Sequence, residues 1–110
     1  MSFQYQIIKI DTHAQNLIGW VALHDGNAIG HVFIHVEPCN KIKFMDAWVD
    51  DSYRRKGIYR KLWDTRYEYA RQHYSGWLVY AWCKPTSIEV FLEHDFEAGD
   101  TATHVHKIIA

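Results

Sequence analysis

The sequence predicts an α+β fold in which one mixed β-sheet carries two helices, and two patterns support this class. In the first half of the chain, short apolar or alternating stretches are separated by turn residues, as in an antiparallel meander. In the second half, a helical pattern lies between two apolar stretches. Such a strand–helix–strand unit implies a right-handed crossover and a parallel pair of strands. The expected order is therefore β-β-β-β-α-β-α-β-β.

The meander is expected to contain four strands, over residues 3–10, 17–24, 28–37 and 42–49. A polar turn over residues 11–16 joins the first two strands. Asp25-Gly26-Asn27 marks a hairpin, because Asp-Gly tolerates the positive dihedrals of a tight turn. Pro38 ends the third strand, because proline cannot donate a hydrogen bond to a sheet.

Residues 58–73 fit a helix, because large apolar side chains recur at three- and four-residue spacing. The stripe they form contains Tyr59, Leu62, Trp63, Tyr67 and Ala70. The helix is expected to stop at Ser75-Gly76. Residues 77–83 are almost wholly apolar, which predicts a strand buried on both faces with Trp77, Tyr80 and Trp82 in the core.

The last part of the chain is expected to contain a short helix and two closing strands. The helix opens at Pro85-Thr86-Ser87, with Thr86 or Ser87 as its N-cap, and extends to about residue 93. The strands cover residues 96–97 and 104–109, on either side of a turn at Ala98-Gly99-Asp100.

The composition favours one folded domain, residues 1–110, without a general affinity for nucleic acid or membrane. Hydrophobic residues make up 48% and charged residues 23%, which excludes a disordered chain. A net charge of −1 gives no overall basic field, so nucleic-acid binding is not expected. No apolar stretch approaches membrane-spanning length and the N-terminus lacks a signal pattern, which favours a cytoplasmic protein.

No metal site or disulfide framework is expected. Cys39 and Cys83 lie far apart and form no CxxC pair. Among the eight histidines, His104 and His106 would point to one face of a strand, but no third ligand has a suitable spacing. We therefore interpret the histidines as surface or edge-strand residues.

The main functional signal is the stretch over residues 49–62, where a strand ends, a basic turn contains Gly57, and a helix begins at about Ile58. Backbone N–H groups at a helix start lack intrahelical partners, and the helix dipole adds positive charge there. The turn and the first helical turn also carry five cations: Arg54, Arg55, Lys56, Arg60 and Lys61. Because Gly57 permits close backbone approach, the pattern predicts an anion site that suits a pyrophosphate.

This stretch resembles the acyl-CoA signature of the GNAT superfamily of N-acyltransferases, whose loop reads Arg or Gln, two residues, Gly, one residue, then Gly or Ala. The matching positions are Val49, Tyr53, Arg54, Gly57, Ile58 and Leu62. The segment Phe91 to Phe96 is similar to the family's ending of the second helix, Tyr-x-x-x-Gly-Phe. The order of elements also matches the family's core, so the resemblance covers nearly the whole chain.

The resemblance implies transfer of an acetyl group from acetyl-CoA to an amine by direct attack. Members of the family lay the pantetheine arm between two splayed parallel strands, here those ending at Val49 and Cys83. The implied coenzyme A contacts are Trp48, Val49, Arg54, Arg55, Lys56, Gly57, Ile58, Tyr59, Arg60 and Lys61. Candidate bases are Asp46 on the fourth strand and Glu37 at the end of the third. A water chain or an amine that binds already neutral would also serve.

The chain departs from the family pattern at three places. Only the six residues 11–16 replace the one or two helices that usually help to form the acceptor site. The acceptor must then be held by other loops, by a second subunit in a homodimer, or in an open groove. Tyr59 stands where Gly or Ala is usual, and Phe91 stands where a tyrosine often protonates the leaving thiolate.

Two other functions stay open at this stage. A non-catalytic acyl-CoA-binding or protein-interaction module would account for Tyr59, Phe91 and the missing acceptor helices. A small nucleic-acid-binding domain would use the basic turn, although the net charge disfavours it. The sequence leaves the amine acceptor and the length of the acyl chain undetermined.

Overall fold

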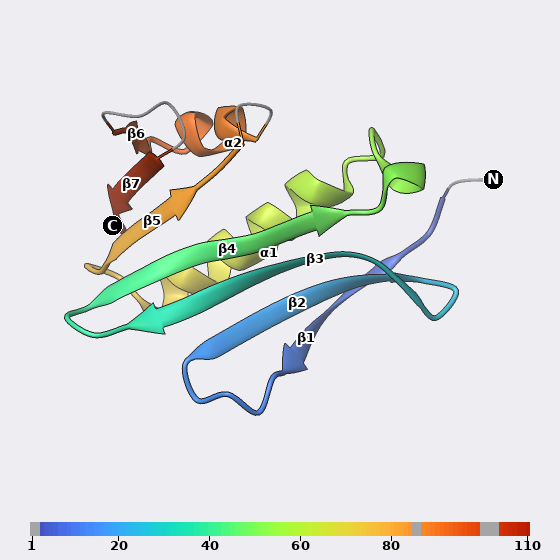
Figure 1. Cartoon of the computed structure of the whole chain (residues 1–110), viewed down its shortest axis with the longest axis horizontal. Helices are drawn as coiled ribbons and strands as arrows, with labels where there is room; N and C mark the ends of the chain where they lie inside the picture. Colours follow the sequence, from blue (N-terminus) through green and yellow to red (C-terminus); the bar gives the residue numbers. More distant parts are fainter. Residues whose placement is uncertain (1–2, 85–86, 100–103) are drawn as a thin grey trace.

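The structure, a computed structural model, describes residues 3–84, 87–99 and 104–110. Within this part of the chain, seven strands form one mixed sheet in the order β1-β2-β3-β4-β5-β7-β6 (Figure 1). The strands are β1 (Gln6–Asp11), β2 (Leu17–His24), β3 (Asn27–Glu37), β4 (Lys41–Val49), β5 (Leu78–Trp82), β6 (Glu97–Ala98) and β7 (His104–Ile108). The helices are the 3-10 helix η1 (Asp51–Tyr53), α1 (Ile58–His73) and α2 (Ile88–Glu93).

The predicted topology is confirmed. Strands β1 to β4 form an antiparallel meander, and β4 pairs with β5 in parallel after the α1 crossover. Helix α1 has the predicted bounds, and the strands differ from prediction by a few residues at their ends. Ser87 precedes α2, but its side chain makes no capping hydrogen bond. The alternative N-cap Thr86 and the turn residue Asp100 lie outside the described residues.

Both helices pack on one face of the sheet. On α1, Leu62 lies under β3 so closely that a Cβ added at Gly30 would stand 3.2 Å from its Cδ1. Helix α2 joins the same layer through Phe91, whose ring meets that of Trp63 edge-on at 5.3 Å. The core consequently lies between the sheet and these two helices, and it includes Ile34, Ile42 and Val79 among its fully buried residues.

The opposite face, which we call the open face, is covered by no helix among the described residues. The prediction that the fifth strand is buried on both faces is therefore wrong. Val79 and Ala81 of β5 are buried under the helices, whereas the Trp82 side chain is 59% exposed on the open face. Trp82 thus does not belong to the core, because only alternate residues of a strand can face a single helical layer.

Strands β4 and β5 separate along their length, which creates the space for a site. Their parallel pairing runs from Lys41 and Leu78 to Phe44 and Ala81 and then stops. Beyond that point β4 continues to Val49 while β5 turns away, so the two strands diverge (Figure 1). Over residues 45–49, no described strand pairs with the β5-facing edge of β4. An unpaired strand edge of this kind offers N–H and C=O groups to a ligand.

A polar contact on the open face links β3 to β5 across β4. The Tyr80 hydroxyl lies 2.6 and 2.8 Å from the two carboxylate oxygens of Glu37. Hydrogen bonding from Tyr80 lowers the pKa of Glu37, and hydrogen bonding to Glu37 raises the pKa of Tyr80 to about 12. Each group therefore holds the other in the protonation state that suits the bond.

We expect Tyr80→Phe to lower the free energy of unfolding at neutral pH by about 1 kcal/mol, the usual net worth of one hydrogen bond. Because the folded-state pKa of Glu37 is lowered, the stabilisation is present above the unfolded pKa and is lost as the pH falls through the folded pKa. Urea denaturation across an acidic pH series measures this loss. Tyr74→Phe, a matched control, should show no such pH dependence, and an equal dependence in both variants would contradict the assignment.

Candidate functional site

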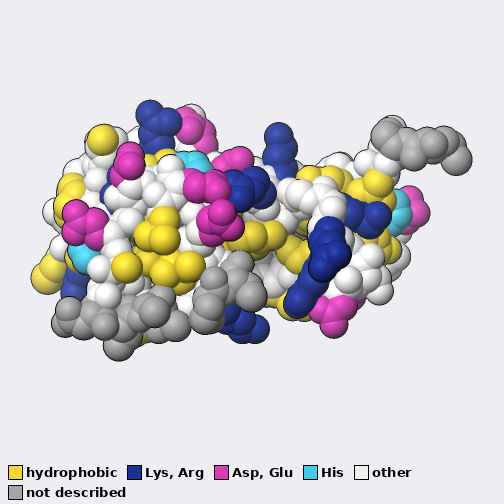
Figure 2. Space-filling view, turned by 90° about the horizontal axis from the view of Figure 1, so that it is seen from above, with side chains coloured by type: hydrophobic (Ala, Val, Ile, Leu, Met, Phe, Trp, Pro, Cys, Tyr) yellow, Lys and Arg dark blue, Asp and Glu magenta, His cyan; other side chains and the backbone are white. Residues whose placement is uncertain are grey.

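The space between the diverging strands is a groove of about 820 Å³, which we call the β4/β5 groove. Its walls come from β4, from the loop and first turn of α1, and from the segment that follows β5. Figure 2 looks onto this edge and shows Lys and Arg side chains on both sides of a hollow that contains hydrophobic side chains. The groove residues used below are Phe44, Asp46, Trp48, Arg54, Arg55, Gly57, Tyr59, Arg66, Ala81 and Cys83.

The start of α1 borders the β4/β5 groove. Gly57 occupies the N-cap in the left-handed conformation, with φ of 78°, and no side chain caps the helix. The first bond of the helix is donated by the Lys61 N–H to the Gly57 carbonyl. A Cβ added at Gly57 would meet nothing within 4 Å, so this side of the turn is open to a ligand. An uncapped helix start without acidic residues suits an anion.

Of the five predicted cations, the structure brings three to the groove. Arg54, Arg55 and Arg60 line it, whereas Lys56 and Lys61 do not. The ammonium of Lys56 lies 5.1 Å from the Phe3 ring centre, and Lys61 lies beside Trp20 on another side of α1.

Two of the three groove arginines already have acidic partners. The Arg54 guanidinium is 2.9 Å from Asp51, and Arg60 forms a two-pronged ion pair with Glu93 of α2. The bond from Arg60 lowers the pKa of Glu93. Arg55 forms no ion pair with another described residue, which leaves its charge available to a ligand.

A bulge in β4 brings Asp46 to the groove. Between two registered pairs, His31 with Trp48 and Phe33 with Met45, β4 uses one residue more than β3. Asp46 takes a left-handed conformation there, with φ of 55°. The extra residue interrupts the simple alternation of side-chain directions along β4. Its exposed carboxylate therefore stands where the strands diverge.

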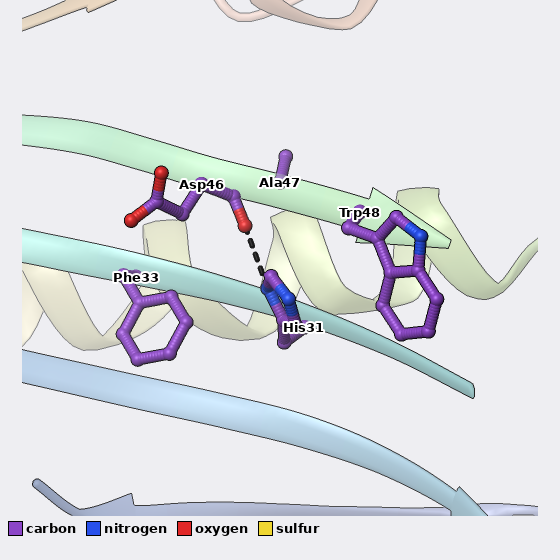
Figure 3. A pocket seen from close by; sticks show the side chains of 5 residues that line it. All are labelled: His31, Phe33, Asp46, Ala47 and Trp48. Atoms are coloured by element: carbon purple, nitrogen blue, oxygen red, sulfur yellow. Dashed lines mark hydrogen bonds between the residues drawn. The ribbon is translucent and has the colours of Figure 1, made fainter. Parts of the chain in front are cut away.

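The same bulge borders a second, shallow hollow on the open face, formed by His31, Phe33, Asp46, Ala47 and Trp48 (Figure 3). We call this the open-face hollow. Nδ1 of His31 lies 2.7 Å from the Asp46 carbonyl oxygen. A carbonyl can only accept, so Nδ1 donates and Nε2 of a neutral His31 ring carries the lone pair. Because Asp46, Ala47 and Trp48 border both spaces, the bulge separates the open-face hollow from the β4/β5 groove.

Glu37, the other predicted base, lies away from this site. It is at the far end of β3, opposite Lys41, and its carboxylate is engaged by Tyr80. It lines neither the groove nor the open-face hollow. We therefore retain Asp46 and not Glu37 among the candidate reactive residues.

Two functional candidates were missed by the sequence reasoning, His31 and Arg66. His31 was passed over because no motif marks it, and only the register of β3 against β4 brings it to the bulge. Arg66 is buried in the groove wall and was left out of the helical stripe because it is charged. Its spacing, four residues after Leu62 and four before Ala70, was the signal that could have found it.

Two further groove residues have environments that limit their chemistry. Burial raises the pKa of the half-buried Tyr59 phenol, so this side chain stays a neutral donor at physiological pH. Burial also raises the pKa of the Cys83 thiol. A thiol with a raised pKa is a poor nucleophile, which argues against a covalent acyl-cysteine at this position.

Comparison with known proteins assigns the chain to a family. Residues 2–96 match the model of the Acetyltransferase (GNAT) family, and the chain therefore belongs to that family. No curated protein matches the chain. No helix among the described residues has the length and apolar character needed to cross a membrane.

Solved structures share the fold at low sequence identity. A protein from Klebsiella pneumoniae assigned to the acyl-CoA N-acyltransferases is 13% identical with a TM-score of 0.74, over 99% of this chain and 100% of that one. The ribosomal-protein-S18-alanine N-acetyltransferase of Escherichia coli is 11% identical with a TM-score of 0.71, over 94% and 90%. A GNAT family N-acetyltransferase of Escherichia coli in complex with CoA is 21% identical with a TM-score of 0.67, over 84% and 59%.

The left-handed conformation of Asp46 in the bulge leads to a prediction about stability that does not depend on any ligand. Asp46→Val should lower the free energy of unfolding by about 1–2 kcal/mol, because a β-branched residue tolerates the left-handed conformation poorly. Asp46→Gly should be neutral or stabilising. Ala47→Val is the matched control, since it places the same β-branched side chain at the next exposed position, which has no left-handed backbone. Equal unfolding free energies for the two valine variants in urea denaturation would count against the bulge.

Proposed function

We propose that residues 1–110 form one N-acetyltransferase domain that transfers an acetyl group from acetyl-CoA to a primary amine. The observation that carries this proposal is the unpaired edge of β4 beside the uncapped start of α1. The strand edge offers N–H and C=O groups to a ligand in the β4/β5 groove, and the helix start offers further N–H groups. Membership of the GNAT family supports the same activity.

Coenzyme A has one favourable orientation in this groove. The pyrophosphate would accept hydrogen bonds from the free N–H groups at the start of α1, next to Arg54 and Arg55. The amides of the pantetheine arm would then pair with the free edge of β4, as an added strand does. The thioester would reach the bulge, where backbone N–H groups around Trp48 and Val49 can polarise its carbonyl.

The amine would approach from the open-face hollow. Its nitrogen attacks the thioester carbonyl carbon, a C–N bond forms, the C–S bond breaks, and CoA leaves as a thiolate. The proton lost by the amine needs an acceptor, and an imidazole is better matched to this task near neutral pH than a carboxylate. We therefore assign proton acceptance to Nε2 of His31, while the Asp46 carboxylate attracts the ammonium form of the acceptor.

The donor site is tested by a matched pair of variants at Gly57. Gly57→Asp and Gly57→Asn introduce side chains of nearly equal size, and both residues tolerate the left-handed backbone. Only the aspartate adds a negative charge next to the pyrophosphate. Calorimetric titration with acetyl-CoA should show at least about tenfold weaker binding for Gly57→Asp than for Gly57→Asn. Equal affinities of the two variants for acetyl-CoA would mean that the phosphates bind elsewhere.

The reactive residues are tested by CoA release with acetyl-CoA and a panel of primary amines. With the best acceptor, His31→Gln should lower kcat by roughly 100-fold, because the glutamine amide cannot accept the proton. Asp46→Asn keeps the shape of the side chain and should mainly raise the KM of the acceptor. A wild-type rate in His31→Gln would contradict its role. Acetyl-CoA binding without CoA release from any amine would instead favour a non-catalytic acyl-CoA-binding module.

A further inference from the structure

Arg66 is a buried cation in the wall of the β4/β5 groove, near its narrow end. It lies in the middle of α1 and is 1% exposed. Its guanidinium carbon is 4.2 Å from the centre of the Phe44 ring. Nη1 donates to the Phe33 carbonyl oxygen at 3.2 Å, and the buried Nε has no hydrogen-bond partner among the described residues.

Arg66 has no acidic partner among the described residues. Burial lowers the pKa of Arg66 to about 9, so the guanidinium still carries its charge at pH 7. A buried charge without a counter-charge is costly, and an aliphatic side chain would pack beside Leu62 and Phe44 without that cost. Within the described part of the chain, the guanidinium makes one hydrogen bond, to the Phe33 carbonyl, which uses one of its five donors. Among the described residues, the buried guanidinium of Arg66 therefore has no counter-anion.

The position of Arg66 indicates where that anion would come from. Phe44 and Ala81, the last parallel pair before the strands diverge, line the groove together with Arg66. With the pyrophosphate at the start of α1 and the thioester at the bulge, the acyl chain would continue toward this narrow end. This step depends on the proposed binding of a CoA thioester.

We propose that Arg66 selects acyl-CoA donors whose acyl group ends in a carboxylate, in preference to acetyl-CoA. The planar guanidinium matches a carboxylate with two parallel hydrogen bonds. The apolar walls formed by Phe44, Ala81 and Phe91 suit the methylene groups between that carboxylate and the thioester. Transfer would then form an amide and leave the terminal carboxylate unchanged on the product.

The wild-type protein alone provides the first test. Malonyl-CoA and succinyl-CoA are compared by calorimetric titration with isovaleryl-CoA and 4-methylpentanoyl-CoA, which replace the carboxylate by a neutral branched end of matching shape. Acetyl-CoA and free CoA are the reference ligands. We expect each anionic donor to bind at least about tenfold more tightly than its neutral counterpart. Equal affinities would overturn the proposal.

Variants then assign the preference to one side chain. Arg66→Met removes the charge at similar volume and should abolish the preference for the anionic donors while leaving the affinity for free CoA unchanged. Arg66→Lys keeps the charge without the planar fork and should retain part of the preference. Arg71→Met, at an exposed position of the same helix, is the control for net charge and should behave as wild type.

The outcomes separate this inference from the proposed function. If the neutral and anionic thioesters bind alike, the CoA site stands and the role of Arg66 falls. A preference that survives in Arg66→Met would also overturn that role. Failure of every CoA compound to bind would overturn both. Thermal unfolding of each variant shows whether it is folded. If Arg66→Met does not fold, the comparison of anionic and neutral donors with the wild-type protein decides the question.

Discussion

The structure depends on the point at which β4 stops pairing with β5. Up to Phe44 and Ala81 the two strands satisfy one another's backbone groups, and the sheet continues across them without interruption. Beyond that pair the edge of β4 must find other partners, because unpaired backbone groups away from water are costly. The divergence also opens the sheet directly beside the start of α1, where four N–H groups lack intrahelical partners. Two sets of unsatisfied donors therefore meet in one groove.

The bulge at Asp46 places a second space next to this groove. An extra residue in β4 allows the segment from Asp46 to Trp48 to border both the β4/β5 groove and the open-face hollow. His31 holds the bulge through its bond to the Asp46 backbone carbonyl, so one ring both stabilises the irregular backbone and lines the open-face hollow. A regular strand would present these residues alternately to opposite faces. The β4/β5 groove and the open-face hollow would then share fewer residues.

The sequence predicted the elements well because their signals are local. The spacing of Leu62, Trp63 and Ala70 defined α1, and Gly57 marked its start, where a left-handed residue is required. What the sequence did not predict depends on contacts distant in sequence. The exposure of Trp82 follows from the uncovered open face, and the direction of Asp46 follows from the register of β3 against β4. The pairing of Arg60 with Glu93 depends on how α2 packs against α1, which no motif specifies.

The short turn over residues 11–16 makes the two sides of the site unequal. No described helix covers the open face, so the open-face hollow is shallow, and Trp48 at its border remains partly exposed. A shallow surface discriminates poorly between ligands. It desolvates little of a bound ligand, so an incorrect ligand leaves few buried polar groups unpaired. The β4/β5 groove is deeper, and it contains the buried guanidinium of Arg66. In the proposed reaction, discrimination would therefore reside mainly in the acyl donor, because a mismatched group in the β4/β5 groove would leave the buried charge of Arg66 uncompensated.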